Sequence, residues 1–367
     1  MVLSLLGAGI QCLWAWKRDA WARSGQDCAG QPFGATSCTV VVCCHNESRH
    51  IERLHVGVSK AVSRAAEKGH QVDVLAVNHG STDDTLSKLQ RVSKCDPAWS
   101  VVDLKRTLPS KKEALEFGVN KAKGDVLLLT DADCIPLSQD WVLDMIHGAA
   151  ECWDVQVGLS LPIPTPSGEP TTWLKRFQRL EARRIAQRTV GAIDAGSPYM
   201  AFGRNLAFTR EIWEQVGGFE KHQNVPSGDD DLWLQEAFAM GARVRACTHR
   251  ESQTSSTWPD SWQAWRRQKT RHFTASAEYP LSVRIKLLTP GLGWLLLIAG
   301  VVHNPSVTSA TCLSLSLMVR SLTFGMFLRR IDQPAKDAWE LLLEPVTSVF
   351  RVWSWGRGQI SDSTPWK

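Results

Sequence analysis

Apolar residues in the first half of the chain fall into short runs, and amphipathic stretches separate these runs. Each run is four to six residues long and rich in Val, Leu or Cys, as expected for buried strands. The predicted strands are 39–44, 72–77, 101–104 and 126–129, and the predicted helices are 50–68, 84–94 and 111–123. Strands and helices that alternate through short turns predict a doubly wound, mostly parallel α/β sheet.

The pattern becomes looser after about residue 150, but it still predicts ordered elements. A strand is expected at 155–161 and, after a proline-rich loop, a long arginine-rich helix at 171–188. A further strand at 203–208 and a helix from 232 to about 240 complete this part. Gly217 and Gly218 predict a turn between the last two elements.

The two ends of the chain are the most apolar parts. Residues 1–16 form an apolar run that is followed by Lys17 and Arg18, which is the reverse of the charge order in a signal peptide. The run is shorter than the ~20 residues that span a bilayer. It therefore predicts a short helix that is either a marginal membrane anchor or lies in the interface.

Two longer apolar segments near the C-terminus, 287–302 and 307–328, are separated by a predicted turn at 303–306. Basic residues flank both outer ends, so the pair predicts a transmembrane hairpin with both ends on the cytoplasmic side. The alternative is a pair of buried helices in a globular domain. Arg320 lies inside the second segment, where it must pack inward or lie near the interface. Residues 339–355 predict a helix in the headgroup plane.

Together these patterns divide the chain into four parts. The prediction is an N-terminal anchor or interfacial helix at 1–23, a linker at 24–36, an α/β domain at 37–275 and a membrane region at 276–367.

Composition narrows the class of partner. The net charge is +5 and the basic residues are scattered, which favours a small anionic substrate or an anionic membrane surface over nucleic acid. The ten cysteines form no CxxC pair, which is typical of a reduced compartment rather than of a disulfide scaffold. The first strand is followed by His45-Asn46-Glu47-Ser48, so no glycine-rich loop for a dinucleotide is present there.

The candidate chemistry lies at the ends of the predicted strands. Asp131 and Asp133 follow the strand 126–129, at the sheet edge where open α/β sheets bind ligands. Carboxylates at this spacing could hold Mg²⁺ or Mn²⁺ beside substrate phosphates, although an Asp-rich turn that caps a helix is the alternative. Glu47, Asp83-Asp84 and the triplet 229–231 follow other elements. Three adjacent carboxylates repel one another, so one is expected to have the raised pKa of a general base.

An ordered set of motifs extends from about Ser37 to Phe273. In chain order these are HNES, NHGSTDDT, KKEAL, GDVLLLTDADC, GRNLAF, VGGF, SGDDDL and QKTRH. The set resembles the family 2 glycosyltransferases. The resemblance implies the GT-A nucleotide-sugar-binding fold, metal-dependent and inverting transfer, and a Gln-x-x-Arg-Trp-like motif found in membrane-associated members.

The resemblance also implies a role for each matching residue. Glu47 and Asn78 would contact the nucleoside, and Lys111 would approach the nucleotide. Asp131 and Asp133 match the DxD motif, with Asp133 as the more direct ligand of Mn²⁺ or Mg²⁺. Asp230 matches the general base, with Asp229 beside it. The residues that would close over the diphosphate and the acceptor are Gln268, Arg271 and His272.

Two positions depart from the family pattern. Asn78-His79 stands where the family usually has two aspartates, which leaves the identity of the nucleotide open. His79 is either a new base contact or a turn residue. His272 replaces the tryptophan of the last motif and keeps an aromatic ring.

The sequence therefore predicts a membrane enzyme of the cell envelope that transfers a sugar from a UDP- or GDP-sugar to a lipid-linked or glycan acceptor. The expected location is a bacterial inner membrane, with the catalytic domain in the cytoplasm. One hairpin is small for a polysaccharide channel, which favours single transfers over processive synthesis. A further alternative is a catalytically silent membrane scaffold that retains the nucleotide-sugar fold.

Overall fold

The computed structural model describes residues 1–15, 34–105, 110–162, 172–225, 227–348 and 350. The chain forms two compact units, each made of segments that are distant in sequence. The sheet unit comprises 25–163, 198–257 and 363–367. The helical unit comprises 1–24, 164–197 and 258–362. The four predicted parts of the chain, with boundaries at 23, 36 and 275, stay a prediction, and residues 24–33 of the linker lie outside the described residues.

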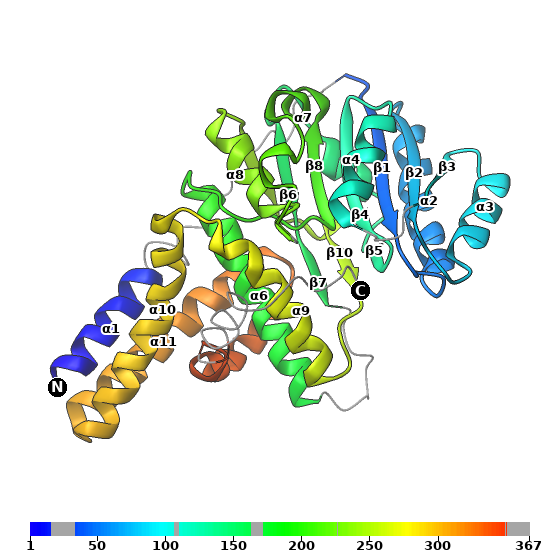
Figure 1. Cartoon of the computed structure of the whole chain (residues 1–367). Helices are drawn as coiled ribbons and strands as arrows, with labels where there is room; N and C mark the ends of the chain where they lie inside the picture. The colour runs from blue at the N-terminus through cyan, green and yellow to red at the C-terminus, as the bar shows by residue number, and fades with distance from the viewer. Residues whose placement is uncertain (16–33, 106–109, 163–171, 226, 349, 351–367) are drawn as a thin grey trace. The chain divides into compact units, whose positions relative to one another are not determined.

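A seven-stranded sheet forms the centre of the sheet unit, with strand order β3-β2-β1-β4-β8-β6-β9 (Figure 1). Its pairs are parallel except those that β8 makes with β4 and β6. The predicted α/β, mostly parallel sheet is therefore confirmed. The strands are β1 Ser37–Cys44, β2 Gln71–His79, β3 Trp99–Leu104, β4 Val126–Asp131, β6 Val155–Gly158, β8 Asn205–Thr209 and β9 Val244–Cys247.

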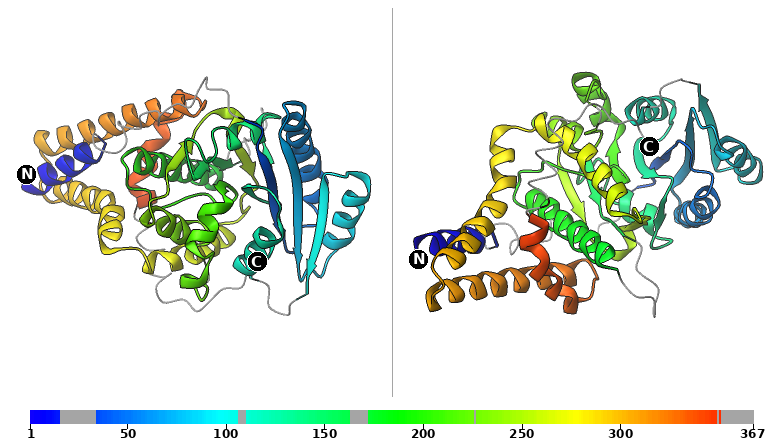
Figure 2. Two further views of the ribbon diagram at one scale, coloured as in Figure 1. Left: turned by 90° about the horizontal axis from the view of Figure 1, so that it is seen from above. Right: turned by 60° about the horizontal axis from the view of Figure 1, so that its bottom comes forward.

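Helices cover both faces of this sheet (Figure 2), which is why β1 and β4 are buried along almost their whole length and are mostly apolar. Val40 and Val42 of β1 pack in one core cluster with residues of α2, α3 and α5. Val41 points the other way, and a Cβ on Gly118 of α4 would lie 2.8 Å from its side chain. The helices of the sheet unit are α2 Ile51–Glu67, α3 Thr85–Cys95, α4 Lys111–Lys121, α5 Trp141–Ile146, α7 Arg210–Val216 and α8 Asp231–Ala239.

A small second sheet joins three segments in the order β5-β10-β7. Its strands are β5 Cys134–Pro136, β7 Ser160–Pro162 and β10 Thr254–Ser256. The single strand predicted at 155–161 is thus two strands, β6 and β7, which belong to different sheets. Because β5 begins directly after Asp133, this sheet fixes the chain on the far side of the predicted metal-binding acids.

The helical unit contains five helices among the described residues, followed by the 3₁₀ helix η5 Ala335–Leu343. The five are α1 Val2–Trp14, α6 Trp173–Asp194, α9 Trp262–Thr274, α10 Leu281–His303 and α11 Val307–Arg330. Both α10 and α11 are long and apolar enough to cross a membrane, and α1 is a shorter apolar helix. The two apolar C-terminal helices and the short N-terminal one agree with the prediction. Residues 351–355 of the predicted interfacial helix lie outside the described residues.

Small residues bring α1 and α10 into close contact. A Cβ on Gly7 would lie 2.7 Å from the carbonyl oxygen of Gly293, and one on Gly300 would lie 2.3 Å from the hydroxyl of Ser4. Close backbone approach at small residues is the usual way in which apolar helices associate in lipid. The N-terminal run is therefore packed on the hairpin helix rather than lying by itself.

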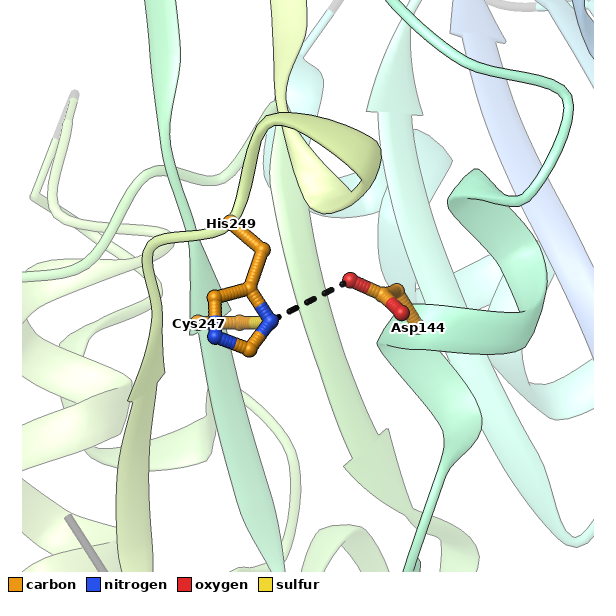
Figure 3. Close-up of side chains that lie close together, drawn as sticks. All are labelled: Asp144, Cys247 and His249. Carbon is orange, nitrogen blue, oxygen red and sulfur yellow. Dashed lines mark ion pairs between the residues drawn. The ribbon is translucent and has the colours of Figure 1, made fainter. Parts of the chain in front are cut away.

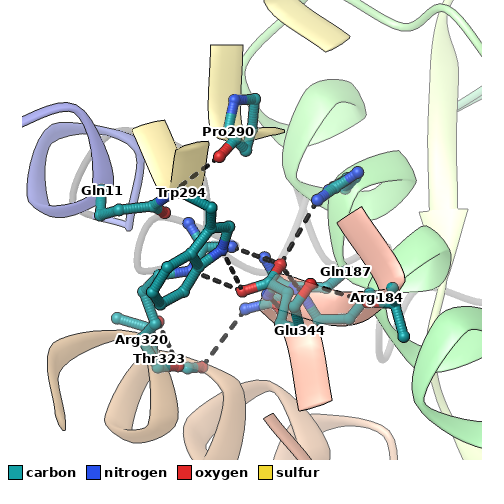
Figure 4. Close-up of polar contacts among 10 residues, drawn as sticks. Gln11, Arg184, Gln187, Pro290, Trp294, Arg320, Thr323 and Glu344 are labelled. Carbon is teal, nitrogen blue, oxygen red and sulfur yellow. Dashed lines mark hydrogen bonds and ion pairs between the residues drawn. The ribbon is translucent and has the colours of Figure 1, made fainter. Parts of the chain in front are cut away.

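A buried ionic cluster, defined here as Arg184, Arg188, Arg320 and Glu344, links α6 and α11 to the segment after η5 (Figure 4). Arg320 donates two hydrogen bonds to the Glu344 carboxylate, at 2.8 and 2.7 Å, and both side chains are fully buried. The indole of Trp294 donates to the same carboxylate at 3.4 Å. Of the two options for Arg320, inward packing is the one observed, and its partner is a glutamate outside the apolar segment.

Most of the described cysteines are not disulfide-bonded. Eight of them are free thiols, and Cys152 is disulfide-bonded. One disulfide does not make a disulfide scaffold, and the predicted reduced compartment stays a prediction.

Candidate functional site

The acids at the end of β4 lie at the carboxyl edge of the main sheet. Asp131 is the last residue of β4, and Asp133 leads into β5. The hydroxyl of Thr257 and the thiol of Cys134 donate weakly to the Asp133 carboxylate, at 3.4 and 3.6 Å. Burial raises the pKa of Asp133, and the negative charge of Asp131 raises it further. Two carboxylates held this close favour a bound cation, which would relieve their repulsion.

Lys111, the first residue of α4, connects these acids to the aspartate triplet. Its Nζ lies 3.1 Å from Asp131 Oδ1 and 3.2 Å from Asp229 Oδ2. Burial alone would lower the pKa of Lys111, but the surrounding carboxylates outweigh it and raise the pKa. Lys111 thus stays charged and joins two segments that are almost a hundred residues apart in sequence.

Asp230 is the N-cap of α8, and its carboxylate is held by two backbone amides. The N–H of Gly203 donates to Oδ2 at 2.8 Å, and the N–H of Asp231 donates to Oδ1 at 2.9 Å. Burial and the charge of Asp229 together raise the pKa of Asp230 to about 6. This carboxylate is therefore ionised at neutral pH yet basic enough to accept a proton.

The pKa of Asp229 is shifted in the opposite direction to that of Asp230. Burial would raise its pKa, but the ion pair with Lys111 outweighs burial and lowers the pKa. A carboxylate held in this way is a weak base. The two adjacent acids therefore differ in what they can do, because only one of them pairs with the lysine.

Lys112 was not among the predicted site residues, yet it holds the loop before the triplet. Its Nζ donates to the carbonyls of His222 and Val225, at 2.6 and 2.9 Å. Burial lowers its pKa to about 8. Two adjacent lysines at the start of a predicted helix are the signal that the sequence offers, and they do not identify backbone partners.

Gly203 is the first residue of the GRNLAF motif, and the sequence did not indicate what this glycine does. A Cβ at this position would lie 3.3 Å from Asp229 Oδ2 and 3.3 Å from Asp230 Cβ. Glycine therefore lets the segment just before β8 approach the two acids closely enough for the Gly203 amide to donate to Asp230.

The ends of β1 and β2 place Glu47 and Asn78. The Glu47 amide donates to Thr85 Oγ1 at 2.7 Å, and its carboxylate lies 3.8 Å from His50 Nε2. Asn78 Nδ2 donates to Asp103 Oδ1 at 2.7 Å, which fixes the orientation of the amide. Asn78 Oδ1 is buried and accepts no hydrogen bond from the described residues.

His79 is the last residue of β2 and fully buried, so the option of a simple turn residue is wrong. Its Nε2 lies 3.2 Å from Glu113 Oε2, on the first turn of α4. The turn itself is made by Gly80, which has a φ of 59°.

Gln268, Arg271 and His272 lie on α9, which belongs to the helical unit. Their spacing places them on one face of that helix. Lys269 of the same helix makes a buried ion pair with Glu181 of α6, at 2.8 Å. These three residues and the acids of the sheet unit belong to different units, so the role predicted for the three stays a prediction.

The comparisons with known proteins concern the family and the fold. Residues 39–217 match the family described as Glycosyl transferase family 2. A search of curated proteins finds no match to the sequence. Among solved structures, the fold is similar to the mannosyltransferase PcManGT from Pyrobaculum calidifontis, which was solved with GDP-Man and Mn²⁺. The TM-score is 0.59 and the identity 18%, over 94% of this chain and 97% of that one.

A second similar structure is glucosyl-3-phosphoglycerate synthase from Mycobacterium tuberculosis, solved with Mn²⁺, UDP and phosphoglyceric acid. Its TM-score is 0.41 and its identity 15%, over 68% of this chain and 84% of that one. The match to the mannosyltransferase confirms the predicted GT-A fold, including the helices that accompany the sheet.

Proposed function

We propose that this chain, whose residues 39–217 match the family described as Glycosyl transferase family 2, transfers a sugar by inversion from a nucleotide-diphosphate sugar to a membrane-proximal acceptor. The observation that carries the proposal is the set of three aspartates around Lys111. Asp131 and Asp229 pair with this lysine, and Asp230 lies beside them with a pKa of about 6. This geometry separates a cation-binding part from a proton-accepting part.

Asp230 is the general base of the proposed reaction. An inverting transfer is one in-line displacement, in which the acceptor hydroxyl loses its proton as it attacks the anomeric carbon. The raised pKa of Asp230 suits this proton transfer near neutral pH, whereas the lowered pKa of Asp229 makes that residue unsuitable. Asp229 instead holds Lys111, so its role is to position the site.

Asp133 and Asp131 fit a divalent cation such as Mn²⁺ or Mg²⁺. Both offer hard oxygen ligands, and the raised pKa of Asp133 marks a carboxylate whose charge is not fully compensated within the protein. A bound cation there would neutralise the charge of the departing diphosphate. The solved neighbour PcManGT contains Mn²⁺ with GDP-Man, which supports the same class of cofactor and donor for this chain.

The donor nucleotide would contact Glu47 and Asn78 at the ends of β1 and β2. Because Asp103 accepts from the amide nitrogen of Asn78, the carbonyl oxygen is the atom left for a base N–H. Uracil and guanine both carry such a donor, so UDP- and GDP-sugars remain the two candidate donors. Lys111 would approach the diphosphate, and Gln268, Arg271 and His272 would close over it.

The acceptor is proposed to be a lipid-linked sugar or another glycan at the membrane. The support is that α10 and α11 are each long and apolar enough to cross a bilayer. Basic residues at their outer ends favour a cytoplasmic catalytic domain at a bacterial inner membrane. A processive synthase and a silent scaffold are the alternatives. The intact acids favour an enzyme, and a single pair of long apolar helices favours single transfers.

The test is a donor screen with the full chain in detergent. UDP- and GDP-sugars would be offered with Mn²⁺, with membrane lipid extract as acceptor, and nucleotide release and glycolipid would be measured. One donor should be consumed with formation of a glycolipid, and Asp133→Ala should abolish the Mn²⁺ dependence of donor binding. If no donor is bound or turned over with Mn²⁺ present, the chain is a catalytically silent scaffold. If the product is a long polymer, the chain is a processive synthase.

A further inference from the structure

Three side chains with metal-binding atoms lie together at the edge of the main sheet, apart from the acids of the proposed catalytic site. They are Asp144 of α5, Cys247 at the end of β9, and His249 two residues later (Figure 3). The strand β9 lies three positions along the sheet from β4. At the usual strand spacing, this is about 14 Å from the acids that follow β4.

The three candidate ligand atoms lie close to the separation that a tetrahedral metal requires. They all lie within 4.8 Å of one another, and His249 Nδ1 is 3.7 Å from Asp144 Oδ2. Metal–ligand bonds of 2.0–2.3 Å place tetrahedral ligands about 3.3–3.8 Å apart. Small movements of the three side chains would therefore be enough to bring their ligand atoms to bonding distance of one ion.

One polar atom of this cluster has no hydrogen-bond partner among the described residues. Asp144 Oδ2 is shielded from solvent and accepts no hydrogen bond from the described residues. The Cys247 side chain is only 3% exposed, and the backbone amide of His249 donates to its sulfur. Amide donors of this kind orient and stabilise sulfur ligands in metal sites. His249 is exposed and leaves a path by which an ion could enter.

We propose that Asp144, Cys247 and His249 bind a thiophilic divalent cation of the Zn²⁺ class, in a site separate from that of the Mn²⁺ or Mg²⁺ used in transfer. Sulfur with imidazole and carboxylate selects zinc over the hard cations that all-oxygen sites prefer. A water molecule would complete the fourth position, because the ligand atoms that lie within 4.8 Å of one another come from these three described residues.

The proposed role is to stabilise the fold. The ion would join α5 to the segment that follows the edge strand β9, and so fix the end of the sheet farthest from β3. A reactive cysteine is the competing explanation, but the Cys247 side chain is only 3% exposed, which is unlike the accessible position of a reactive thiol. The other explanation is a simple ion pair between Asp144 and His249.

Cobalt titration of the full chain in detergent distinguishes these possibilities, because Co²⁺ bound by a thiolate gives a sulfur-to-metal absorption that oxygen sites lack. The wild type should bind one such Co²⁺ per chain, and Zn²⁺ should displace it. Cys247→Ser should lose the absorption. His249→Gln should weaken Co²⁺ binding at least tenfold, and the exposed Cys95→Ser should bind as the wild type does.

Circular dichroism would verify that each variant is folded. Cys247 lies in the core, so the surface variant His249→Gln decides the question if Cys247→Ser does not fold. The proposal is overturned if the wild type gives no sulfur-to-metal absorption, or if folded His249→Gln binds Co²⁺ with unchanged affinity. The readout does not depend on sugar transfer, so a failure of the proposed enzymatic function would leave it intact.

Discussion

Two groups of buried charges, one in each unit, have opposite compositions. In the sheet unit, Lys111 is surrounded by carboxylates, and the side chains of Asp131 and Asp229 are 31% and 14% exposed. In the helical unit, several arginines converge on Glu344, and Arg320 and Glu344 are completely buried. The first group has an excess of negative charge at a partly open edge of the sheet. The second is closed to solvent and rich in cations.

The difference separates a binding site from a structural joint. Where partly accessible carboxylates are in excess, a bound cation reduces their mutual repulsion and so lowers the free energy of the folded protein. A fully buried ion pair gains nothing from solvent access, and its bidentate arginine geometry fixes how the segments pack. The same physical interaction therefore serves ligand binding in one unit and helix packing in the other. Each prediction below tests one side of this contrast.

The largest expected effect is the loss of catalysis in Asp230→Asn. Removing the general base should lower the turnover number by about 10³-fold, because positioned bases contribute about 10²–10⁴-fold. Donor affinity, measured by titration with the nucleotide sugar, should change little. Asp84→Asn is the control, since Asp84 makes no side-chain cap bond to α3. A turnover number within a few-fold of wild type would remove Asp230 from the base role.

Glu344→Gln should destabilise the protein without removing the chemistry. Loss of the carboxylate leaves buried arginine charge without its partner, at a cost of about 3 kcal/mol in the free energy of unfolding. Thermal unfolding in detergent would measure this loss of stability. Glu52→Gln is the control, since the Glu52 side chain is 80% exposed and pairs with Lys88 at the surface. Equal stability of the two variants would show that the ionic cluster is not a structural joint.

The pH dependence of transfer should follow Asp230. With a pKa of about 6, its active carboxylate form is lost as the pH falls through 6, and the rate should drop about tenfold for each further pH unit. The contribution of Asp230 to the free energy of unfolding depends on pH in the opposite direction to the rate. Because folding raises this pKa, the contribution is fully present below the ordinary pKa of an aspartate and is lost as the pH rises to about 6. A transfer rate that stays constant down to pH 5 would contradict the assignment of Asp230 as the general base.

The smallest effect is expected for Lys112→Gln. The substitution leaves two buried carbonyls, those of His222 and Val225, without their lysine donor, so the unfolding free energy should fall by about 1–3 kcal/mol. Because the loop holds the triplet in place, transfer should fall only a few-fold. Lys121→Gln at the other end of α4 is the control. A loss of activity as large as that of Asp230→Asn would mean that Lys112 contacts the substrate.

The local elements of the sheet unit could be predicted well because their signals are local. Each predicted strand from 39 to 129 lies within an observed strand, since residues buried on both faces must be apolar along the whole run. The helix predicted at 171–188 is also present, but it belongs to the helical unit. Its arginines gave no hint of their partners, because Glu340 and Glu344 lie about 160 residues away.

The amino-acid sequence by itself determined the elements, the acids at the strand ends and the apolar helices, because periodicity and turn chemistry depend on neighbouring residues. It also provided the motif order that carries the resemblance to the family 2 glycosyltransferases. Only the tertiary structure decided how the acids differ. Asp229 and Asp230 are adjacent and chemically identical, yet Lys111 lowers the pKa of one while burial raises that of the other. The reason is that a pKa depends on charges and solvent in three dimensions, which no spacing along the chain contains.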